Sequence, residues 1–265
     1  MLFGEILDNG EFDMNIAVIT GASSGMGKEF VVQLDKEKEF DEIWVIARRE
    51  GRLLELQKEV RAKIRAIPMD LTARDSIEKY GELLSQHKPN VSVLVNAGGF
   101  GRFGSFEGLK LDEQLDMIDL NLKALTSMTY KTLPYMSAGS EIYQLVSLSA
   151  FQPVPYLNVY AATKAYGLSF SRALGVELKP RGIRVLAVCP GWVKTEFFDR
   201  AKTDDTLTYF NKLFTAEDVI RRALRDMKKG KDVSVCGFGI RCQVLFTKLM
   251  PHRLIMKIWC KQQNK

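Results

Sequence analysis

The first residues that could do chemistry are Tyr160 and Lys164, which lie four apart in Tyr160-Ala161-Ala162-Thr163-Lys164. On a helix this spacing puts the phenol and the ammonium on one face, about one turn apart. A free tyrosine has a pKa of about 10, so acid–base catalysis at neutral pH needs nearby positive charge. At ~4 Å and an effective dielectric constant of ~20 that attraction is about 4 kcal/mol, roughly three pKa units before desolvation is subtracted. Taken alone, the pair is interpreted as structural, because any amphipathic helix can pack a tyrosine and solvate a lysine four residues apart.

The elements that must position this pair follow from hydrophobic periodicity. Short apolar runs alternate with longer amphipathic stretches, without an internal repeat. The predicted strands are Ile16–Thr20, Ile43–Ala47, Ile64–Pro68, Val91–Val95, Glu141–Ser147, Ile183–Val188 and Asp232–Cys236. The predicted helices are Met26–Lys36, Gly51–Ala62, Ala73–Gln86, Asp112–Leu133, Leu157–Leu178 and Ala216–Lys229. This alternation predicts one Rossmann-type α/β domain, a doubly wound parallel sheet of about seven strands that binds ligands outside its carboxyl ends.

A glycine-rich segment, Thr20-Gly21-Ala22-Ser23-Ser24-Gly25-Met26-Gly27, directly follows the first predicted strand and opens a helix. Glycines there permit a tight turn and close backbone approach, and free N–H groups at the helix start attract phosphate. The alternative is a strand–helix turn that only requires positive φ. Because the segment opens the alternating pattern, we predict a dinucleotide pyrophosphate site.

The end of the second predicted strand indicates which dinucleotide. About 20 residues beyond the glycines, where a carboxylate would bind the adenosine ribose, the chain has Arg48 and Arg49. Guanidinium groups suit a ribose 2′-phosphate, so NADP is favoured over NAD. Either arginine could instead be a solvated loop charge, Arg49 more readily than Arg48. Asp70, after the third strand, could cap the next helix or bind the adenine amino group.

Further motifs extend this pattern in chain order. Asn96-Ala97-Gly98 follows the fourth strand, Asn121 lies inside the fourth helix, and Ser147 ends the fifth strand, thirteen residues before Tyr160. Pro190-Gly191 follows the sixth strand. With the glycine turn and the Tyr160–Lys164 pair, these motifs resemble the short-chain dehydrogenase/reductase family of the classical type, from Met14 to about Cys236. The chain departs from that family pattern at Val146 and Met26, and neither change removes a reactive group.

The resemblance implies roles for these residues. Tyr160 would be the general acid for a carbonyl oxygen, Ser147 would orient that oxygen, and Lys164 would bind the nicotinamide ribose and depress the tyrosine pKa. Asn121 would hold a water in a proton relay, or it is a buried helix-kink residue. Ser149 is a chemical rival to Ser147 but lies two residues too close to Tyr160. The predicted cofactor-binding residues are Thr20, Gly21, Ser23, Ser24, Gly25, Met26, Gly27, Arg48, Arg49, Asp70, Leu71, Asn96, Ala97, Gly98, Tyr160, Lys164, Pro190, Gly191, Val193 and Thr195.

Aromatic residues gather in the segments after the fourth, fifth and sixth strands, which build the substrate pocket in that family. The predicted pocket residues are Phe100, Phe103, Phe151, Pro153, Val154, Pro155, Tyr156, Trp192, Phe197 and Phe198. A hydrophobic slot of this kind suits a bulky ketone, such as a fatty-acyl or steroid-like carbonyl, and its secondary alcohol. The competing hypothesis is a catalytically silent NADP(H)-binding sensor or scaffold, against which the intact serine, tyrosine and lysine argue.

Charge and cysteine use limit partners and compartment. The net charge is +6, yet residues 233–265 hold six basic and no acidic residues, so the rest has 32 of each and offers no nucleic-acid footprint. The four cysteines form no CxxC or metal-ligand pattern, so we expect no metal and a reducing, cytoplasmic location. Segment 1–13 is no signal peptide and shows no clear fold, and Met14 could be the start.

The segment after the catalytic domain (14–236) is a basic, apolar extension (237–265) that Pro251 divides. Each half is too short to span a bilayer, for which about 20 residues are needed. It could be a lid over the pocket, a subunit contact or an amphipathic pair on an anionic membrane surface. The resemblance implies a homodimer or homotetramer built on the fourth and fifth helices.

Overall fold

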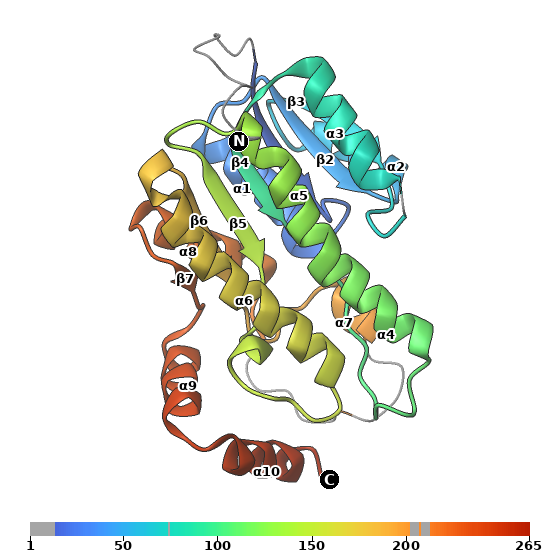
Figure 1. Cartoon of the computed structure of the whole chain (residues 1–265), viewed down its shortest axis with the longest axis vertical. Coiled ribbons are helices and arrows are strands. Elements are labelled where there is room, and N and C mark those ends of the chain that lie inside the picture. The colour runs from blue at the N-terminus through green and yellow to red at the C-terminus, as the bar shows by residue number, and fades with distance from the viewer. Residues whose placement is uncertain (1–13, 74, 202–206, 208–212) are drawn as a thin grey trace.

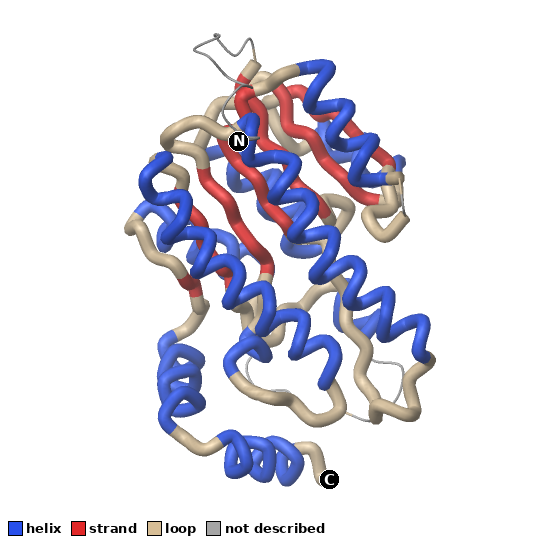
Figure 2. The backbone as a smooth tube through the Cα atoms, in the orientation of Figure 1, coloured by secondary structure: helices blue, strands red, loops and turns tan. Residues whose placement is uncertain are grey.

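The structure is a computed structural model that describes residues 14–73, 75–201, 207 and 213–265. Segment 1–13 lies outside the described residues, so its lack of fold and the role of Met14 as a start stay predictions. The described chain forms a central sheet with helices on both faces and two further helices at the carboxyl end (Figures 1 and 2).

The sheet confirms the predicted doubly wound α/β fold. Its seven strands are all parallel and lie in the order β3-β2-β1-β4-β5-β6-β7. The strands are β1 (Asn15–Thr20), β2 (Glu42–Ala47), β3 (Lys63–Pro68), β4 (Asn90–Asn96), β5 (Glu141–Leu145), β6 (Arg184–Val188) and β7 (Val233–Ser234). The chain winds outward in one direction from β1 and in the other from β4, so a crevice opens between the carboxyl ends of these two strands.

Two layers of helices cover the sheet. The helices are α1 (Gly25–Glu37), α2 (Glu50–Glu55), α3 (Ser76–His87), α4 (Leu111–Ile118), α5 (Leu125–Thr132), α6 (Asn158–Leu178), α7 (Glu196–Ala201), α8 (Ala216–Lys228), α9 (Phe238–Leu249) and α10 (His252–Gln262). Buried side chains of α1, α2 and α8 pack on one face, and those of α3, α5 and α6 pack on the other. In Figure 1 the second layer lies in front of the sheet.

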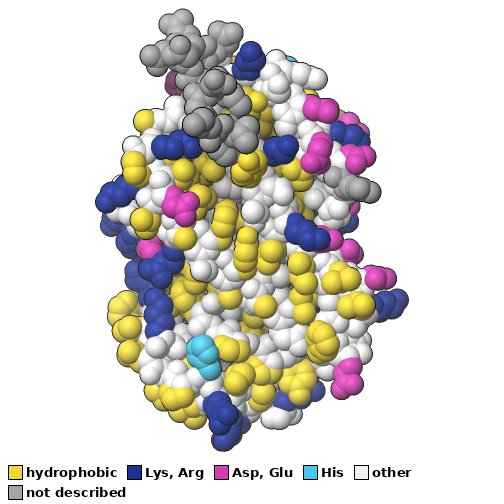
Figure 3. Space-filling view, viewed as in Figure 1, with side chains coloured by type: hydrophobic (Ala, Val, Ile, Leu, Met, Phe, Trp, Pro, Cys, Tyr) yellow, Lys and Arg dark blue, Asp and Glu magenta, His cyan; other side chains and the backbone are white. Residues whose placement is uncertain are grey.

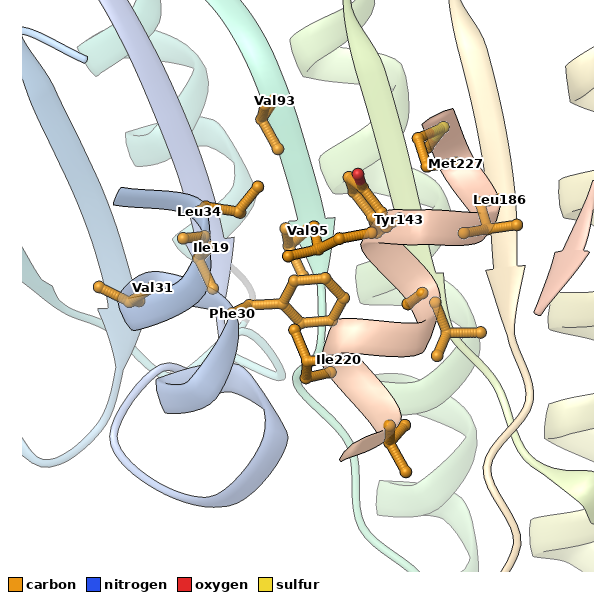
Figure 4. Close-up of a cluster of buried hydrophobic side chains, with 14 of the residues drawn as sticks. Ile19, Phe30, Val31, Leu34, Val93, Val95, Tyr143, Leu186, Ile220 and Met227 are labelled. Atoms are coloured by element: carbon orange, nitrogen blue, oxygen red, sulfur yellow. The ribbon is translucent and has the colours of Figure 1, made fainter. Parts of the chain in front are cut away.

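The cores on the two faces explain why the central strands read as continuous apolar runs. In β1, successive residues such as Ile16 and Ala17 point into opposite cores, and both are fully buried. On the face of α1 and α8, Phe30 lies with its ring centroid 5.2 Å from that of Tyr143 on β5 (Figure 4). This packing fixes the carboxyl ends of the strands, where the reactive residues begin.

Several element boundaries differ from the prediction. Strand β5 ends at Leu145 rather than Ser147, and the predicted helix Asp112–Leu133 is α4 and α5 joined by a π-helical segment, Asp119–Ala124. Helix α7 was not predicted at all. Periodicity could not reveal the π-helical segment, because a wider turn changes backbone hydrogen bonding without breaking the apolar pattern, and such segments often occur at functional sites.

The carboxyl-terminal extension forms α9 and α10, separated at Met250–Pro251. Proline has no backbone N–H, so it begins a new helix more readily than it continues one. No helix among the described residues is long and apolar enough to cross a membrane.

Candidate active site

One large cavity runs along the carboxyl ends of the strands, with a volume of ≈ 860 Å³. Its lining begins at the glycine turn after β1, passes Ser147, Tyr160 and Lys164, and ends at side chains of α9 and α10. The sequence motifs that lie far apart in the chain therefore open into a single space. This is the position at which a doubly wound sheet binds its ligand.

The glycine turn leaves a cradle that side chains would fill. Gly21 has φ +67°, and a Cβ there would lie 2.7 Å from the Ala97 carbonyl oxygen. A Cβ on Gly27 would lie 2.3 Å from the Gly21 carbonyl oxygen. Helix α1 starts at Gly25, and its N-cap residue Ser24 makes no side-chain cap hydrogen bond, which leaves the first N–H groups for a ligand. The turn therefore fits a pyrophosphate group.

Thr20 and Asn96, two of the predicted cofactor-binding residues, make hydrogen bonds beneath the glycine turn and do not reach the cavity surface. The Gly98 N–H donates to Thr20 Oγ1 at 3.0 Å, and the Asn96 side-chain amide donates to Thr129 Oγ1 at 3.0 Å. Thr20 and Asn96 are buried and do not line the cavity, whereas Gly98 does. The Thr20 side chain joins β1 to β4 and the segment after it, and the Asn96 side chain joins β4 to α5, so contact of these two residues with the cofactor stays a prediction.

The two arginines after β2 differ in exposure in the opposite sense to the prediction: Arg48 is the more exposed and Arg49 the less exposed. Arg49 donates from Nη2 to Ser23 Oγ and Ser24 Oγ, both at 2.9 Å, and pairs through Nη1 with Glu196 at 2.9 Å. The Arg48 side chain is 70% exposed and lies 3.8 Å from the Asp70 carboxylate. The prediction that Arg49 is the more solvated of the two arginines is therefore wrong, because α7 places the Glu196 carboxylate beside it.

Glu196 is a site residue that sequence reasoning missed. Besides Arg49 it pairs with Arg52, and hydrogen bonds from Arg49 and then Arg52 lower the pKa of Glu196 to about 2. Glu196 lines the cavity at the first turn of α7. No local signal could have found it, because Arg49 and Glu196 are 147 residues apart in the chain.

The segment after β3 borders the cavity beside Arg48. Asp70 and Leu71 both line the cavity. Asp70 Oδ1 accepts from the Thr72 N–H at 3.0 Å and from Thr72 Oγ1 at 2.8 Å, so this oxygen closes a local turn and does not cap α3. Its second oxygen lies 3.8 Å from Arg48 Nη1, and the contact of Asp70 with the adenine amino group stays a prediction.

The predicted catalytic residues Ser147, Tyr160 and Lys164 lie together at the centre of the cavity. Ser147 follows β5, while Tyr160 and Lys164 occupy the first turns of α6, on one face as expected. Tyr160 is buried, and a hydrogen bond links it to Ser147. Lys164 is buried as well, and its Nζ donates to the Leu145 carbonyl oxygen at 2.9 Å.

Burial governs the protonation of this group of residues. Desolvation raises the pKa of Tyr160 to about 12, while the hydrogen bond with Ser147 opposes the rise. Desolvation also lowers the pKa of Lys164 to about 8. We expected Lys164 to lower the pKa of Tyr160, but the pKa of Tyr160 is raised in this structure. The physical reason is that desolvation destabilises the phenolate more than the Lys164 ammonium stabilises it. Lys164 Nζ lies 5.7 Å from the centroid of the Tyr160 ring.

Asn121 lies in the π-helical segment and is 1% exposed. Its side chain accepts from the Phe100 N–H at 3.0 Å and donates to the Phe100 carbonyl oxygen at 2.8 Å and to Thr163 Oγ1 at 3.2 Å. Asn121 thus joins the loop after β4 to α6, beside but not on the cavity surface. Its place in a proton relay stays a prediction.

The remaining polar candidates gather around Ser147. The Ser149 N–H donates to Ser147 Oγ at 3.2 Å, so the rival serine helps to orient the one at the predicted spacing, and both line the cavity. Pro190, Gly191, Val193 and Thr195, which follow β6, line it too. These four residues face the same space as the glycine turn.

The apolar end of the cavity contains only some of the predicted aromatics. Phe100, Phe103, Trp192 and Phe197 line it together with Val154. The Tyr160 and Phe197 ring centroids are 5.7 Å apart. Three other predictions are corrected: Pro153 is exposed, Phe151 packs against the main core, and Tyr156 packs outside the cavity. Pro155 does not line the cavity either, and the Phe198 side chain lies outside the described residues.

Side chains of the carboxyl-terminal extension (237–265) form the rest of the apolar wall of the cavity. Ile255, Ile258 and Trp259 of α10 line the cavity, and Trp259 Nε1 donates to the Pro155 carbonyl oxygen at 3.0 Å. From α9, the lining includes Val244 and Phe246. The sequence indicated a lid as one of three roles for this segment, but it could not say which side chains would face inward.

Comparison with known proteins agrees with this architecture. The family model described as short chain dehydrogenase matches residues 15–206. Sulfoacetaldehyde reductase 2 of Chromohalobacter salexigens is 32% identical over 192 residues, covering 69% of this chain and 74% of its own. A short-chain dehydrogenase from Sphingobium yanoikuyae in complex with NADPH superposes with a TM-score of 0.76 at 25% identity, covering 92% of this chain and 95% of its own.

A second solved structure shares the fold with a different nucleotide. The short chain dehydrogenase/reductase of Burkholderia phymatum in complex with NAD has a TM-score of 0.75 at 19% identity, with 89% and 93% of the chains covered. The chain belongs to the short chain dehydrogenase family. It is an oxidoreductase of that family, whose fold binds a nicotinamide dinucleotide.

Proposed function

We propose that this protein is an NADP(H)-dependent oxidoreductase that interconverts a bulky hydrophobic ketone and its secondary alcohol. The observation that carries the proposal is the continuity of the cavity, which joins the glycine turn to Tyr160 and then to an apolar wall. A ligand that spans it would meet backbone N–H groups at one end and aromatic rings at the other. A small polar acid would leave that wall in contact with water, which opposes its binding.

When bound, a nicotinamide would supply the hydride for reduction. The residues of the chain then act on the substrate oxygen: Ser147 orients it by a hydrogen bond, and Tyr160 donates the proton that balances the charge. Because burial holds the Tyr160 pKa at about 12, the phenol keeps that proton at neutral pH until a stronger base forms beside it. Apolar neighbours such as Phe197 exclude water from the reacting atoms.

The preference for NADP rests on Arg48. Arg49 is already bonded to the serines of the turn and to Glu196, whereas Arg48 lines the cavity with an exposed guanidinium. A 2′-phosphate would form charge-assisted hydrogen bonds with Arg48, each about 1.5–3 kcal/mol. Arg49 instead holds the shape of the turn, which every nicotinamide dinucleotide uses.

These two roles can be separated by titrating both nucleotides. Arg48→Ala should weaken NADPH binding roughly 10–100-fold and leave NADH within about twofold. Arg49→Ala, the matched control, should weaken both nucleotides similarly. Equal losses of both nucleotides in Arg48→Ala would contradict the 2′-phosphate assignment.

The substrate class is tested by a panel of carbonyls of rising size, followed at the nicotinamide absorbance. Bulky apolar ketones should be reduced with higher kcat/KM than small polar carbonyls. A preference for small acids or sugars would overturn the substrate proposal. Tight NADPH binding without turnover of any carbonyl would instead favour the sensor or scaffold hypothesis.

We also propose a homodimer or homotetramer that uses the face of α4, α5 and α6. Large apolar side chains are exposed there, including Leu115 at 46%, Tyr130 at 58% and Val176 at 74%. Figure 3 shows hydrophobic side chains running down this face. Sedimentation of the wild type and of Tyr130→Asp should reveal an oligomer that the variant weakens, and a wild-type monomer at micromolar concentration would contradict it.

A further inference from the structure

Helix α9 is apolar on two opposite sides. Ile240 and Val244 are buried against the core, and Thr247, three residues beyond Val244 on the same face, is buried as well. On the other side, Phe238 is 75% exposed and Leu249 is 75% exposed. The outward row contains Phe238, Cys242, Leu245 and Leu249, whose spacing of four, three and four residues keeps it on one face of a helix. The core needs only the first side, so the outward row has no function in folding.

Helix α10, which follows α9, carries positive charge on its exposed side. Arg253, Lys257 and Lys261 lie four residues apart and are all exposed, so they form one basic line along the helix. Leu254 and Ile258, 41% and 39% exposed, lie beside that line. Residues 233–265 contain no acidic residue. In Figure 3, the lower left of the molecule, where α9 and α10 lie in Figure 1, shows hydrophobic and basic side chains together.

We propose that the outer surface of α9 and α10 docks on an anionic lipid bilayer. Apolar side chains beside uncompensated lysines and arginines complement a surface with acyl chains below negative headgroups. A second copy of this chain is a poorer partner, because a symmetric contact would bring two purely basic segments together. Both helices, of 12 and 11 residues, lie along such a surface, since they are too short to cross it.

The docking surface includes the rim of the cavity. Phe246 and Ile258 both line the cavity and remain 48% and 39% exposed. Side chains that do both must lie where the cavity meets the outside. A ketone dissolved in the bilayer would therefore enter between α9 and α10 without crossing water. This entry route rests on the proposed function, whereas the docking itself requires no reaction.

Flotation of the full chain with vesicles tests the docking. At 50 mM salt the protein should float with vesicles of 70% phosphatidylcholine and 30% phosphatidylserine. It should float much less with pure phosphatidylcholine, or with the anionic vesicles at 500 mM salt, because added salt screens the headgroup charge. Absence of flotation with anionic vesicles at 50 mM salt would overturn the proposal.

Paired variants identify the surface. Leu245→Ser/Leu249→Ser should reduce partitioning at least tenfold, and Lys257→Ala/Lys261→Ala about 25-fold, since each basic residue near the surface contributes about fivefold. None of these four residues lines the cavity. The controls are Leu54→Ser and Lys58→Ala/Lys179→Ala, which change exposed residues elsewhere and should leave partitioning unchanged. Equal losses in controls and α9–α10 variants would refute the assignment.

Two further outcomes keep the alternatives distinct. If the wild type sediments as an oligomer that Leu245→Ser/Leu249→Ser dissociates, and does not float, the surface binds a second copy and the lipid proposal fails. Turnover of a water-soluble ketone should be unchanged in the α9–α10 variants, while turnover of the same class of ketone carried in anionic vesicles should fall with their partitioning. If the wild type floats with anionic vesicles but turns over neither the water-soluble ketone nor the vesicle-carried ketone, the proposed reaction is contradicted and the docking is not.

Discussion

Two regions that line the same cavity are held in different ways. The proposed catalytic floor, formed by Ser147, Tyr160 and Lys164, lies where β5 ends and the 21-residue helix α6 begins. Its side chains are tied to the sheet, as in the bond from Lys164 to the Leu145 carbonyl oxygen. The tail wall, formed by Ile255, Ile258 and Trp259, follows the last strand on α10 and is fixed to the body by contacts such as the bond of Trp259 to Pro155.

The difference shows how reaction and selectivity are separated. The catalytic floor needs positions accurate to a fraction of an ångström, which a packed parallel sheet supplies. The tail wall needs only shape and apolar surface, which two short helices can supply outside the sheet. Changes in the catalytic floor should therefore act on kcat, and changes in the tail wall on KM and on the choice of ketone.

The largest effect is expected from Tyr160→Phe, which removes the proton donor and keeps the ring. We expect kcat to fall 10²–10⁴-fold, the usual contribution of a positioned general acid. Steady-state kinetics with a bulky ketone and NADPH measure it. Thermal unfolding should be little changed, which separates lost chemistry from lost folding. An unchanged kcat would remove Tyr160 from the mechanism and break the comparison.

The cofactor cradle gives the next effect. Gly27→Ala places a Cβ 2.3 Å from the Gly21 carbonyl oxygen, so the turn must move away from its pyrophosphate-binding shape. We expect roughly 10–100-fold weaker NADPH binding by fluorescence titration. Gly51→Ala on α2 is the matched control, because a Cβ there meets nothing within 4 Å. Full NADPH affinity in Gly27→Ala would argue against this turn as the phosphate site.

The tail wall should give a smaller and differently distributed effect. Trp259→Ala removes an aromatic side chain from the cavity and its bond to Pro155, and we expect KM for a bulky ketone to rise about tenfold. kcat should stay within about threefold. Trp259→Phe keeps a ring and should lose less. If Trp259→Ala lowered kcat as strongly as Tyr160→Phe, the tail wall would belong to the catalytic apparatus.

The smallest effect concerns Lys164 and pH. Its pKa of about 8 in the folded protein lies below the unfolded value, so the folded state holds fewer protons above pH 8 and burial of the charge becomes less costly as pH rises. Between pH 8 and pH 9 the wild type should gain about 1 kcal/mol in unfolding free energy over Lys164→Met. Urea unfolding measures this gain. Tyr160, with its raised pKa, acts in the opposite direction only above about pH 10.

A constant difference between the two proteins across that range would contradict the lowered lysine pKa. In that case the ammonium would be solvated, and the catalytic floor would be less enclosed than the geometry indicates. The comparison of the two regions would then depend on Tyr160 alone.

The sequence determined the parallel sheet, the glycine turn and the serine–tyrosine–lysine set, because each follows from local pattern and from order along the chain. Strand periodicity, the turn after β1 and the spacing within α6 involve neighbours only. Even the spacing of thirteen positions from Ser147 to Tyr160 covers one connection between adjacent elements. Local patterns were therefore enough to predict the elements that carry these residues, and the family resemblance identified Ser147, Tyr160 and Lys164 as the residues that would meet there.

Only the tertiary structure decided how the remaining residues divide their work. Arg49 is bound to Glu196, 147 residues away, and Arg48 stays exposed. Asn96 turns toward Thr129 and out of the cavity. Trp259 reaches Pro155 across 104 residues and closes the apolar end. Such pairings arise when distant segments share one packed surface, and no spacing in the chain encodes them.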